Sequence, residues 1–287
     1  LLKVIPSTVK KIAVLDRTKE QGSIGEPLYL DILRAVNEMD KVPKVYGGRY
    51  GLGSKDVFPR DIVAVYENLN KDKPINSFTI GIEDDVTNLS LKSDESLEIV
   101  DDSITSCKFY GLGSDGTVGA NKSAIKIIGD NTDKEVQAYF SYDSKKSGGI
   151  TISNLRFGDK KIRSHYEVNE ANFIACHNQS YINKYDILKG LKKNGTFVLN
   201  TIWTEEELER KLSNKVKRYL AENNINFYVI NAIEIARQVG LGGRINMIMQ
   251  SVFFKLANII EPEQAIKYLK EAVVTAYERK GEKIVNM

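Results

Sequence analysis

The chain contains 287 residues, of which 42% are hydrophobic and 28% are charged, proportions typical of a globular protein with a sizeable core. Its net charge of +3 is the small difference between 41 basic and 38 acidic residues, which argues against a nucleic-acid-binding surface. No apolar run approaches the roughly 20 residues that a membrane helix needs, so we expect neither nucleic acid nor a membrane among its partners.

The first part of the chain shows the alternation of strands and helices that is typical of an α/β domain. A continuous apolar run at 12–15 predicts a buried parallel strand. A helix is expected to begin near Pro27, because proline suits the first helical turn. Further strands are predicted at 42–45 and 78–82.

Between the second and third of these strands, we expect a glycine-rich loop at 47–54 and then a helix from Pro59. So few elements indicate the C-terminal remainder of a domain. Both ends of the chain are expected to be cuts within a longer polypeptide. The predicted apolar face of the helix comprises Ile62, Val65, Tyr66 and Leu69.

An acidic segment follows, in which residues 83–102 hold eight carboxylates and one cation, Lys92. Such a run is usually a solvated connector, so we predict a linker at 86–103 and place the domain boundary there. The carboxylates are Glu83, Asp84, Asp85, Asp94, Glu95, Glu98, Asp101 and Asp102.

A second, complete α/β pattern begins after the linker. A strand at 107–110 enters a glycine-rich turn, a helix runs through 124–129, and the next strand is predicted at 136–140. The segments 149–157 and 161–168 alternate in polarity, which predicts that they pair as a β-hairpin insertion.

Three more core strands are predicted at 173–175, 197–199 and 227–230, with helices between them. One of these helices begins with a capping box at Thr204, and the closing helix runs from Pro262 to near residue 281. The fold class is therefore α/β, with mostly parallel, helix-covered sheets. The apolar face of the helix after Thr204 comprises Leu208, Leu212, Val216 and Tyr219.

Cys107 and Cys176 are the only cysteines in the sequence, which suits a reducing cytoplasm and argues against a disulfide framework. A [4Fe–4S] cluster needs about four thiolates, so this chain cannot hold one alone. Cys176 is followed by His177, but neighbouring residues of a strand point to opposite faces and chelate a metal poorly. We expect no metal site here, only a buried thiol followed by a loop histidine.

Gly111, Gly113 and Gly116 match the pattern G-x-G-x-x-G, directly after a strand and before a helix. Glycines permit close approach, and a helix N-terminus offers unpaired N–H groups to an anion. A dinucleotide site needs an acidic residue about 20 residues on, whereas Asp143 lies 27 residues beyond Gly116. From these residues alone, a phosphate-bearing ligand, a dinucleotide and a purely structural turn all stay open.

Two further segments bear on the ligand. Residues 144–149 read SKKSGG, and adjacent lysines suit a phosphate group better than a ribose hydroxyl. A second glycine cluster at 240–244 lies between two helices. In one interpretation, its glycines cap a helix and allow tight packing. In the other, Arg244 and the following helix N-terminus face a ligand or a neighbouring domain. Both interpretations stay open.

Six blocks spread over nearly the whole chain resemble, in order, the pyruvate:ferredoxin (flavodoxin) oxidoreductases. The resemblance identifies the chain as an internal fragment of such an enzyme. It implies that residues 1–85 form the C-terminal part of a transketolase C-terminal-like domain. Residues 104–287 would then form a Rossmann-like, gamma-type catalytic domain. The blocks are 15–31, 44–56, GLGSDGTVGANK at 111–122, SKKSGG at 144–149, 175–200 and GLGGRINMIMQ at 240–250.

The resemblance also implies a reaction. Pyruvate and coenzyme A would give acetyl-coenzyme A and carbon dioxide, with reduction of ferredoxin or flavodoxin, in a cytoplasmic enzyme whose parent polypeptide is a homodimer. Thiamine diphosphate with Mg²⁺ and [4Fe–4S] clusters would supply the chemistry. Their motifs do not occur in this sequence, so we expect these cofactors in other domains of the parent polypeptide and expect this fragment alone to be inactive.

By the same resemblance, the chain is expected to contribute no catalytic side chain but to help form the coenzyme A site. Paired lysines would supply compact positive charge for the phosphates of that ligand. A free-standing Rossmann-type NAD(P)-binding protein and a pure assembly surface are the alternatives. The expected contacts are Lys145, Lys146, Ser147, Gly148 and Gly149, with Gly111, Gly113 and Gly116 as structural support.

Overall fold

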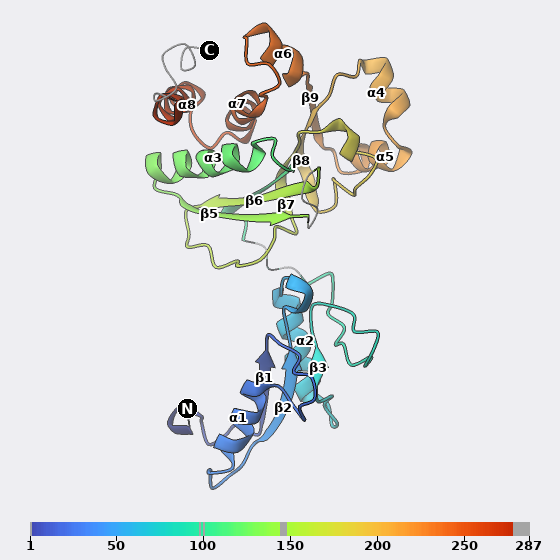
Figure 1. Cartoon of the computed structure of the whole chain (residues 1–287), viewed down its shortest axis with the longest axis vertical. Helices are drawn as coiled ribbons and strands as arrows, with labels where there is room; N and C mark the ends of the chain where they lie inside the picture. The colour runs from blue at the N-terminus through green and yellow to red at the C-terminus, as the bar shows by residue number, and fades with distance from the viewer. Residues whose placement is uncertain (1, 98, 100, 144–147, 278–287) are drawn as a thin grey trace. The chain divides into compact units, whose positions relative to one another are not determined.

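The computed structural model describes residues 2–97, 99, 101–143 and 148–277. The chain divides into two compact units, Leu1–Val100 and Asp101–Met287 (Figure 1). Each unit contains its own mostly parallel sheet with helices packed against it, so the predicted α/β class is confirmed.

The first unit has a three-stranded parallel sheet in the order β1-β2-β3. Its strands are β1 (Lys11–Asp16), β2 (Lys44–Arg49) and β3 (Phe78–Thr79), and its helices are α1 (Pro27–Val36) and α2 (Pro59–Asn70). The 3₁₀ turns Leu2–Val4 and Leu52–Ser54 complete the unit.

The glycines predicted to begin a loop after the second strand belong to the strand itself. Gly47 and Gly48 lie within β2, and a side chain at Gly48 would overlap the ring of Phe78, which is fully buried. The prediction was wrong because glycine serves here for close packing across the sheet rather than for a turn.

The buried face of α2 also differs from the prediction. Asp61 and Asn68 are buried, whereas Ile62 is 38% and Tyr66 is 66% exposed. The polar pair is satisfied internally, because the Asp61 carboxylate accepts the N–H of Phe58 at 2.8 Å and the Asn68 side chain bonds the backbone of Ile75. Satisfied polar groups can therefore occupy the inner face.

Part of the acidic segment folds back onto the first unit. The Asp84 carboxylate accepts the backbone N–H groups of Val86 and Thr87 and the Thr87 hydroxyl, which closes a turn. The N–H of Leu91 then bonds the carbonyl of Thr79 at 2.9 Å, so the chain returns to β3.

The second unit has a six-stranded sheet in the order β5-β6-β4-β7-β8-β9. Strands β4, β7, β8 and β9 run parallel, while β6 is antiparallel to both of its neighbours. The bounds are β4 Ile104–Leu112, β5 Glu135–Tyr142, β6 Ile150–Gly158, β7 Ala171–Cys176, β8 Leu191–Asn200 and β9 Asn226–Ile230.

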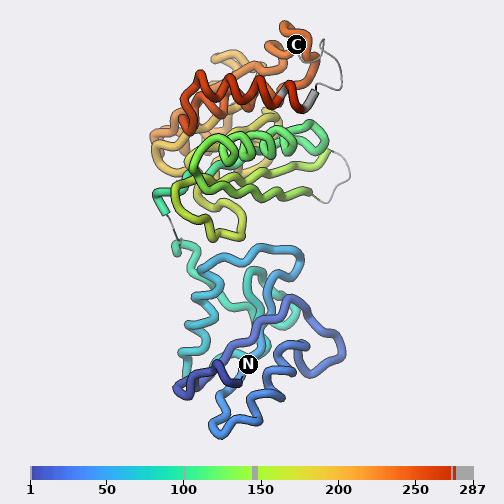
Figure 2. The backbone as a smooth tube through the Cα atoms, turned by 90° about the vertical axis from the view of Figure 1, so that its left-hand side faces the viewer, coloured from blue at the N-terminus to red at the C-terminus, as the bar shows by residue number. Residues whose placement is uncertain are grey.

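Helices cover both faces of this sheet (Figures 1 and 2). One face packs on α3 (Thr117–Asn131), α7 (Asn246–Ala257) and α8 (Pro262–Tyr277), and the other on α4 (Glu205–Lys211) and α5 (Asn214–Glu222). The short helix α6 (Ala232–Gln238) packs against α7. Within the part of the chain that the structure describes, no helix is both long and apolar enough to cross a membrane.

The second unit has one hydrophobic core on each face of its sheet, because successive side chains of a strand point to opposite faces. Cys107 and Phe109 of β4 pack on the α3 face, whereas Tyr110 packs on the α5 face. In β7, Phe173 and Ile174 divide in the same way. Strands that are apolar on both sides are typical of a sheet covered by helices on both faces.

The predicted β-hairpin of residues 149–157 with 161–168 does not form. Strand β6 pairs with β5 on one side and β4 on the other, and residues 161–168 form no strand. The buried Arg156 donates to the carbonyls of Ser164, Tyr166 and Glu167. Because these carbonyls accept hydrogen bonds from the guanidinium, they do not pair with a neighbouring strand.

The helix after the predicted capping box is divided into two. The capping box at Thr204 is confirmed, but α4 ends at Lys211 and α5 begins at Asn214, where the Ser213 side chain accepts the N–H of Val216. Because Ser213 caps the start of a new helix, α4 and α5 are separate helices and not one continuous helix. The closing helix begins at Pro262 as predicted, and its predicted end near residue 281 lies outside the described residues.

Candidate functional site

The candidate site lies at the carboxyl edge of the parallel strands of the second unit. Strand β4 ends at Leu112 and runs through a glycine-rich turn into α3, which begins at Thr117. The adjacent strand β7 ends at Cys176, and β8 ends at Asn200. Ligands of open α/β sheets bind at this edge, where loops and helix N-termini meet.

Two of the three glycines in the turn have a steric role, and the third makes a hydrogen bond to Gly149. A side chain at Gly111 would lie 2.6 Å from the Cβ of Thr117, so glycine lets α3 approach the strand. Gly116 has a φ of +86°, and a side chain there would overlap the amide of Asn246. The N–H of Gly113 donates to the carbonyl of Gly149 at 2.8 Å.

Asp115 fixes the turn from inside. Its carboxylate accepts the N–H of Leu112 at 2.8 Å and the N–H of Thr117 at 2.7 Å. The first helical turn leaves its other N–H groups, those of Val118 and Gly119, without intrahelical acceptors. Gly119 is exposed, and there is open space where its side chain would be. The start of α3 is therefore open beside Gly119, and unpaired N–H groups at a helix N-terminus attract anions.

The structure brings together the predicted glycines of both segments. Gly148, with a φ of +71°, and Gly149 precede β6, and Gly149 binds Gly113. Strands β5 and β6 form an antiparallel hairpin, and Asp143 closes the same end of it, because its N–H donates to the carbonyl of Ile150 at 3.0 Å. The other predicted contacts, at 145–147, lie outside the described residues.

The second glycine cluster leads into the same site. Gly240 and Gly242 have φ values of +80° and +63°, which suits the capping role predicted for them. After the exposed Arg244, α7 begins with Asn246, whose side-chain amide donates to the carbonyl of Asp115 at 2.6 Å. The N-terminus of α7 therefore faces the glycine turn.

His177 is one of the site residues that sequence reasoning missed, with Asp115, Asn200 and Asn246. It follows β7 in a bend, as a loop histidine was expected to, but it is buried, and its Nδ1 lies 2.9 Å from the Thr117 hydroxyl. Burial lowers the pKa of His177 to about 4, against the opposing effect of the Asp115 carboxylate. The imidazole is therefore neutral at physiological pH. Its position at the carboxyl end of a predicted parallel strand was the available signal.

Asn200 extends this network across the sheet. Its amide donates to the carbonyl of His177 at 2.9 Å, and its carbonyl oxygen accepts the N–H of Ala232 at the start of α6. The chain of contacts runs from Asn246 through the glycine turn to His177 and Asn200. With Gly149, which binds Gly113, the site is thus fixed by residues from five separate parts of the sequence.

The cysteines lie in the core. Cys107 and Cys176 are fully buried, and burial raises the pKa of both thiols, that of Cys176 to about 12. The buried thiol predicted at Cys176 is therefore confirmed. Among the described residues, no group of three or more His, Cys, Asp or Glu side chains could hold a metal ion.

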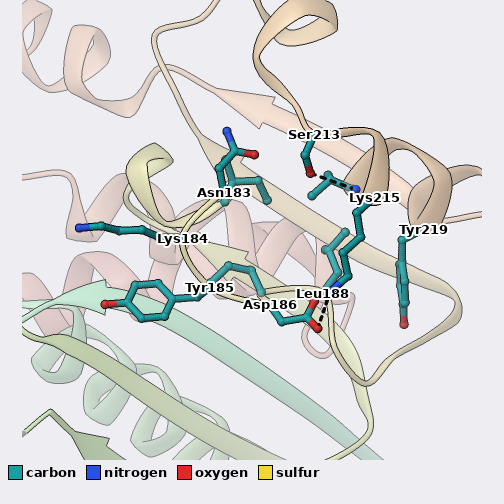
Figure 3. A pocket seen from close by; sticks show the side chains of 11 residues that line it. Asn183, Lys184, Tyr185, Asp186, Leu188, Ser213, Lys215 and Tyr219 are labelled. Carbon is teal, nitrogen blue, oxygen red and sulfur yellow. Dashed lines mark hydrogen bonds and ion pairs between the residues drawn. The ribbon is translucent and has the colours of Figure 1, made fainter.

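A cavity of about 250 Å³ lies elsewhere in the second unit, between residues 182–188 and α5 (Figure 3). The side chains of Asp186 and Lys215 form an ion pair of 2.9 Å between its two walls. Its apolar lining, which includes Ile182, Ile187 and Val216, belongs to the core on the α5 side of the sheet, whereas Asn183, Lys184 and Asp186 are exposed. None of the predicted site residues lines it.

Comparison with known proteins gives consistent matches. The family model for pyruvate ferredoxin/flavodoxin oxidoreductase matches residues 106–287. The chain is 58% identical to a pyruvate-flavodoxin oxidoreductase of Klebsiella pneumoniae, covering 99% of the chain and 24% of that protein. It is 54% identical to a pyruvate:ferredoxin oxidoreductase of Moorella thermoacetica, covering 100% of the chain and 24% of that protein. Among solved structures, pyruvate oxidoreductase subunit PORC of Thermotoga maritima matches with 17% identity and a TM-score of 0.49, covering 64% of this chain and 89% of that one.

Proposed function

Because the chain belongs to the pyruvate ferredoxin/flavodoxin oxidoreductase family, we propose that it is one part of an enzyme converting pyruvate and coenzyme A to acetyl-coenzyme A and carbon dioxide. In this reaction ferredoxin or flavodoxin takes up the electrons. The chain spans 24% of the length of the two relatives. The proposed whole enzyme is a cytoplasmic homodimer, in which the other parts of the polypeptide adjoin this one.

The donor groups of this chain do not fit the cofactors of the proposed reaction. Both thiols are fully buried with raised pKa values, whereas an iron–sulfur cluster needs several accessible thiolates. We therefore assign the [4Fe–4S] clusters, and thiamine diphosphate with Mg²⁺, to other parts of the enzyme. No step of the chemistry is assigned to a side chain of this chain.

The proposed role of this part is to help hold coenzyme A. The observation that supports it is the hydrogen bond from Gly113 to Gly149, which joins Gly149 to the turn before α3. Lys145 and Lys146, close to Gly149 in sequence, would then supply charge beside the N–H groups at the start of α3. Coenzyme A carries phosphates, which helix N-termini and lysines both bind.

The two units also have proposed identities. Residues 1–85 are the end of a transketolase C-terminal-like domain, 86–103 are an acidic linker, and 104–287 are the gamma-type domain. Ser147, Gly148 and Gly149 complete the proposed ligand segment, and Gly111, Gly113 and Gly116 shape the turn that supports it.

Coenzyme A titration calorimetry on the intact enzyme tests this role. The double variant Lys145→Ala/Lys146→Ala should bind coenzyme A at least about tenfold more weakly, because it loses two charge-assisted contacts. The matched control is Lys160→Ala/Lys161→Ala, an exposed lysine pair beyond the opposite end of β6. Unchanged affinity in the first variant would refute the assignment and favour a pure assembly surface.

The NAD(P)-binding alternative is not favoured. In a dinucleotide-binding unit, the strand after the first helix lies beside the first strand and carries the ribose-binding acid. Here β6 lies between β4 and β5, and Asp143 closes the β5–β6 hairpin. Saturable binding of NAD or NADP by the chain would reverse this conclusion.

A further inference from the structure

The glycine turn is joined to the neighbouring strand by one pair of side chains. Thr117 and His177 are 60 residues apart in sequence, yet the Thr117 hydroxyl lies 2.9 Å from Nδ1 of the imidazole. Thr117 is fully buried and His177 is 6% exposed. A hydrogen bond away from water is stronger than an exposed one, and removing one of its buried partners leaves the other unpaired at a cost in free energy.

Both partners are fixed independently of each other. The N–H of Thr117 is held by the Asp115 carboxylate at 2.7 Å, and its Cβ packs where Gly111 leaves room. The backbone of His177 donates to the carbonyl of Tyr110 at 2.9 Å and accepts the Asn200 amide at 2.9 Å. The bond therefore connects two rigid pieces, the start of α3 and the end of β7.

The Thr117 hydroxyl is too buried to touch a ligand, and the imidazole carries no charge that an anion could use. The charged group facing this pair is Asp115, whose two oxygens already accept backbone N–H groups. The pair must therefore act through the backbone that it holds, which is the first turn of α3 at the half-buried Val118 and the exposed Gly119.

We propose that Thr117 and His177 are positioning residues that fix the N-terminus of α3 for the phosphates of the ligand. Their hydrogen bond holds the first helical turn at a constant distance from the segment at Gly149. The inference rests on the proposed coenzyme A role of this site, and it identifies residues beyond those predicted from the sequence.

Variants of the intact enzyme test the pair. His177→Phe and Thr117→Val each remove one partner while keeping most of its volume, and each should weaken coenzyme A binding about tenfold in calorimetry. The double variant should be no weaker than either single one, because the two changes remove the same bond. His177→Asn, which keeps a polar atom near the position of Nδ1, should restore most of the affinity. The exposed His165→Phe is the control.

Hydrogen–deuterium exchange of residues 111–122 in the ligand-free intact enzyme separates the two proposals. Exchange there should be faster in His177→Phe and Thr117→Val and unchanged in Lys145→Ala/Lys146→Ala. If the wild-type enzyme bound no coenzyme A but exchange still rose, the proposed function would fail, while the finding that the pair holds the first turn of α3 would stand. Exchange equal to wild type in both variants, or additive losses of affinity in the double variant, would overturn the positioning role.

Discussion

At the scale of single residues, the glycine turn combines steric and electrostatic roles that one sequence pattern does not separate. Gly116 adopts a left-handed conformation against Asn246, while Gly119 lies in the first turn of α3 beside open space. The first glycine is needed for the shape of the turn. The second is needed only if a ligand occupies the space beside it.

Gly116→Ala and Gly119→Ala should therefore have opposite effects on stability. Alanine at Gly116 is strained at positive φ and displaces the Asn246 amide, so the free energy of unfolding should fall by about 1–3 kcal/mol. Alanine at Gly119 meets no atom within 4 Å and should raise it by up to about 1 kcal/mol. Urea unfolding of the two variants gives both values. Equal effects would contradict the assigned roles.

The neutral imidazole of His177 predicts a pH dependence. Its pKa is lowered to about 4 in the folded state from its usual 6.5. Below the usual value the unfolded chain binds the proton more readily, so stability is lost as pH falls towards about 4, by about 1.4 kcal/mol for each pH unit. Urea unfolding at several pH values between 5 and 7 should show this loss in wild type and His165→Asn. The slope should be smaller in His177→Asn, and an equal slope would contradict the burial argument.

Sequence predicted the local part of the site and not its long-range part. The three glycines and the following helix are contiguous, so their pattern identifies the turn. His177 reaches Thr117 across 60 residues, and Asn246 reaches Asp115 across 131 residues. These contacts depend on which strands and helices become neighbours, which one sequence without the fold does not reveal.

At the scale of elements, the buried parallel strands were predicted well because continuous apolar runs identify them. The hairpin was misassigned because residues 161–168 alternate in polarity without forming a ladder. The buried guanidinium of Arg156 decides between the two structures. It binds the Gln137 side chain at 2.9 Å and carbonyls of the following loop, including that of Tyr166 at 2.7 Å.

Replacing Arg156 by methionine should therefore release that loop. The variant keeps much of the side-chain volume but leaves several carbonyls without a donor, so the free energy of unfolding should fall by about 2–4 kcal/mol. Trypsin should cut faster at Lys160, Lys161 and Arg163. The control is Lys134→Met, which breaks a more exposed ion pair with Asp159 and should change stability by less than about 1 kcal/mol. Unchanged cleavage in the Arg156 variant would show that the loop is held by other contacts.

At the scale of the whole chain, each unit builds its core from its own residues. The described core of the first unit includes Val65, Phe78 and Ile80, and the two cores of the second unit lie within residues 107–269. The first unit has few strands and helices, yet its residues form a buried hydrophobic cluster of their own. The two units should therefore respond separately to mutation.

Phe78→Ala and Phe253→Ala test this separation. Both side chains are almost fully buried. Phe78 packs on Gly48, and the ring centroids of Phe253 and Phe109 lie 5.1 Å apart. Each truncation should remove about 3–5 kcal/mol of stability, but only from the unit that contains it, because the cavity disrupts packing locally. Hydrogen–deuterium exchange resolves the two cases. Phe78→Ala should accelerate exchange in β1 and β2 and leave α3 and β4 protected, and Phe253→Ala should do the reverse. Loss of protection in both units from either change would mean that they unfold as one cooperative body.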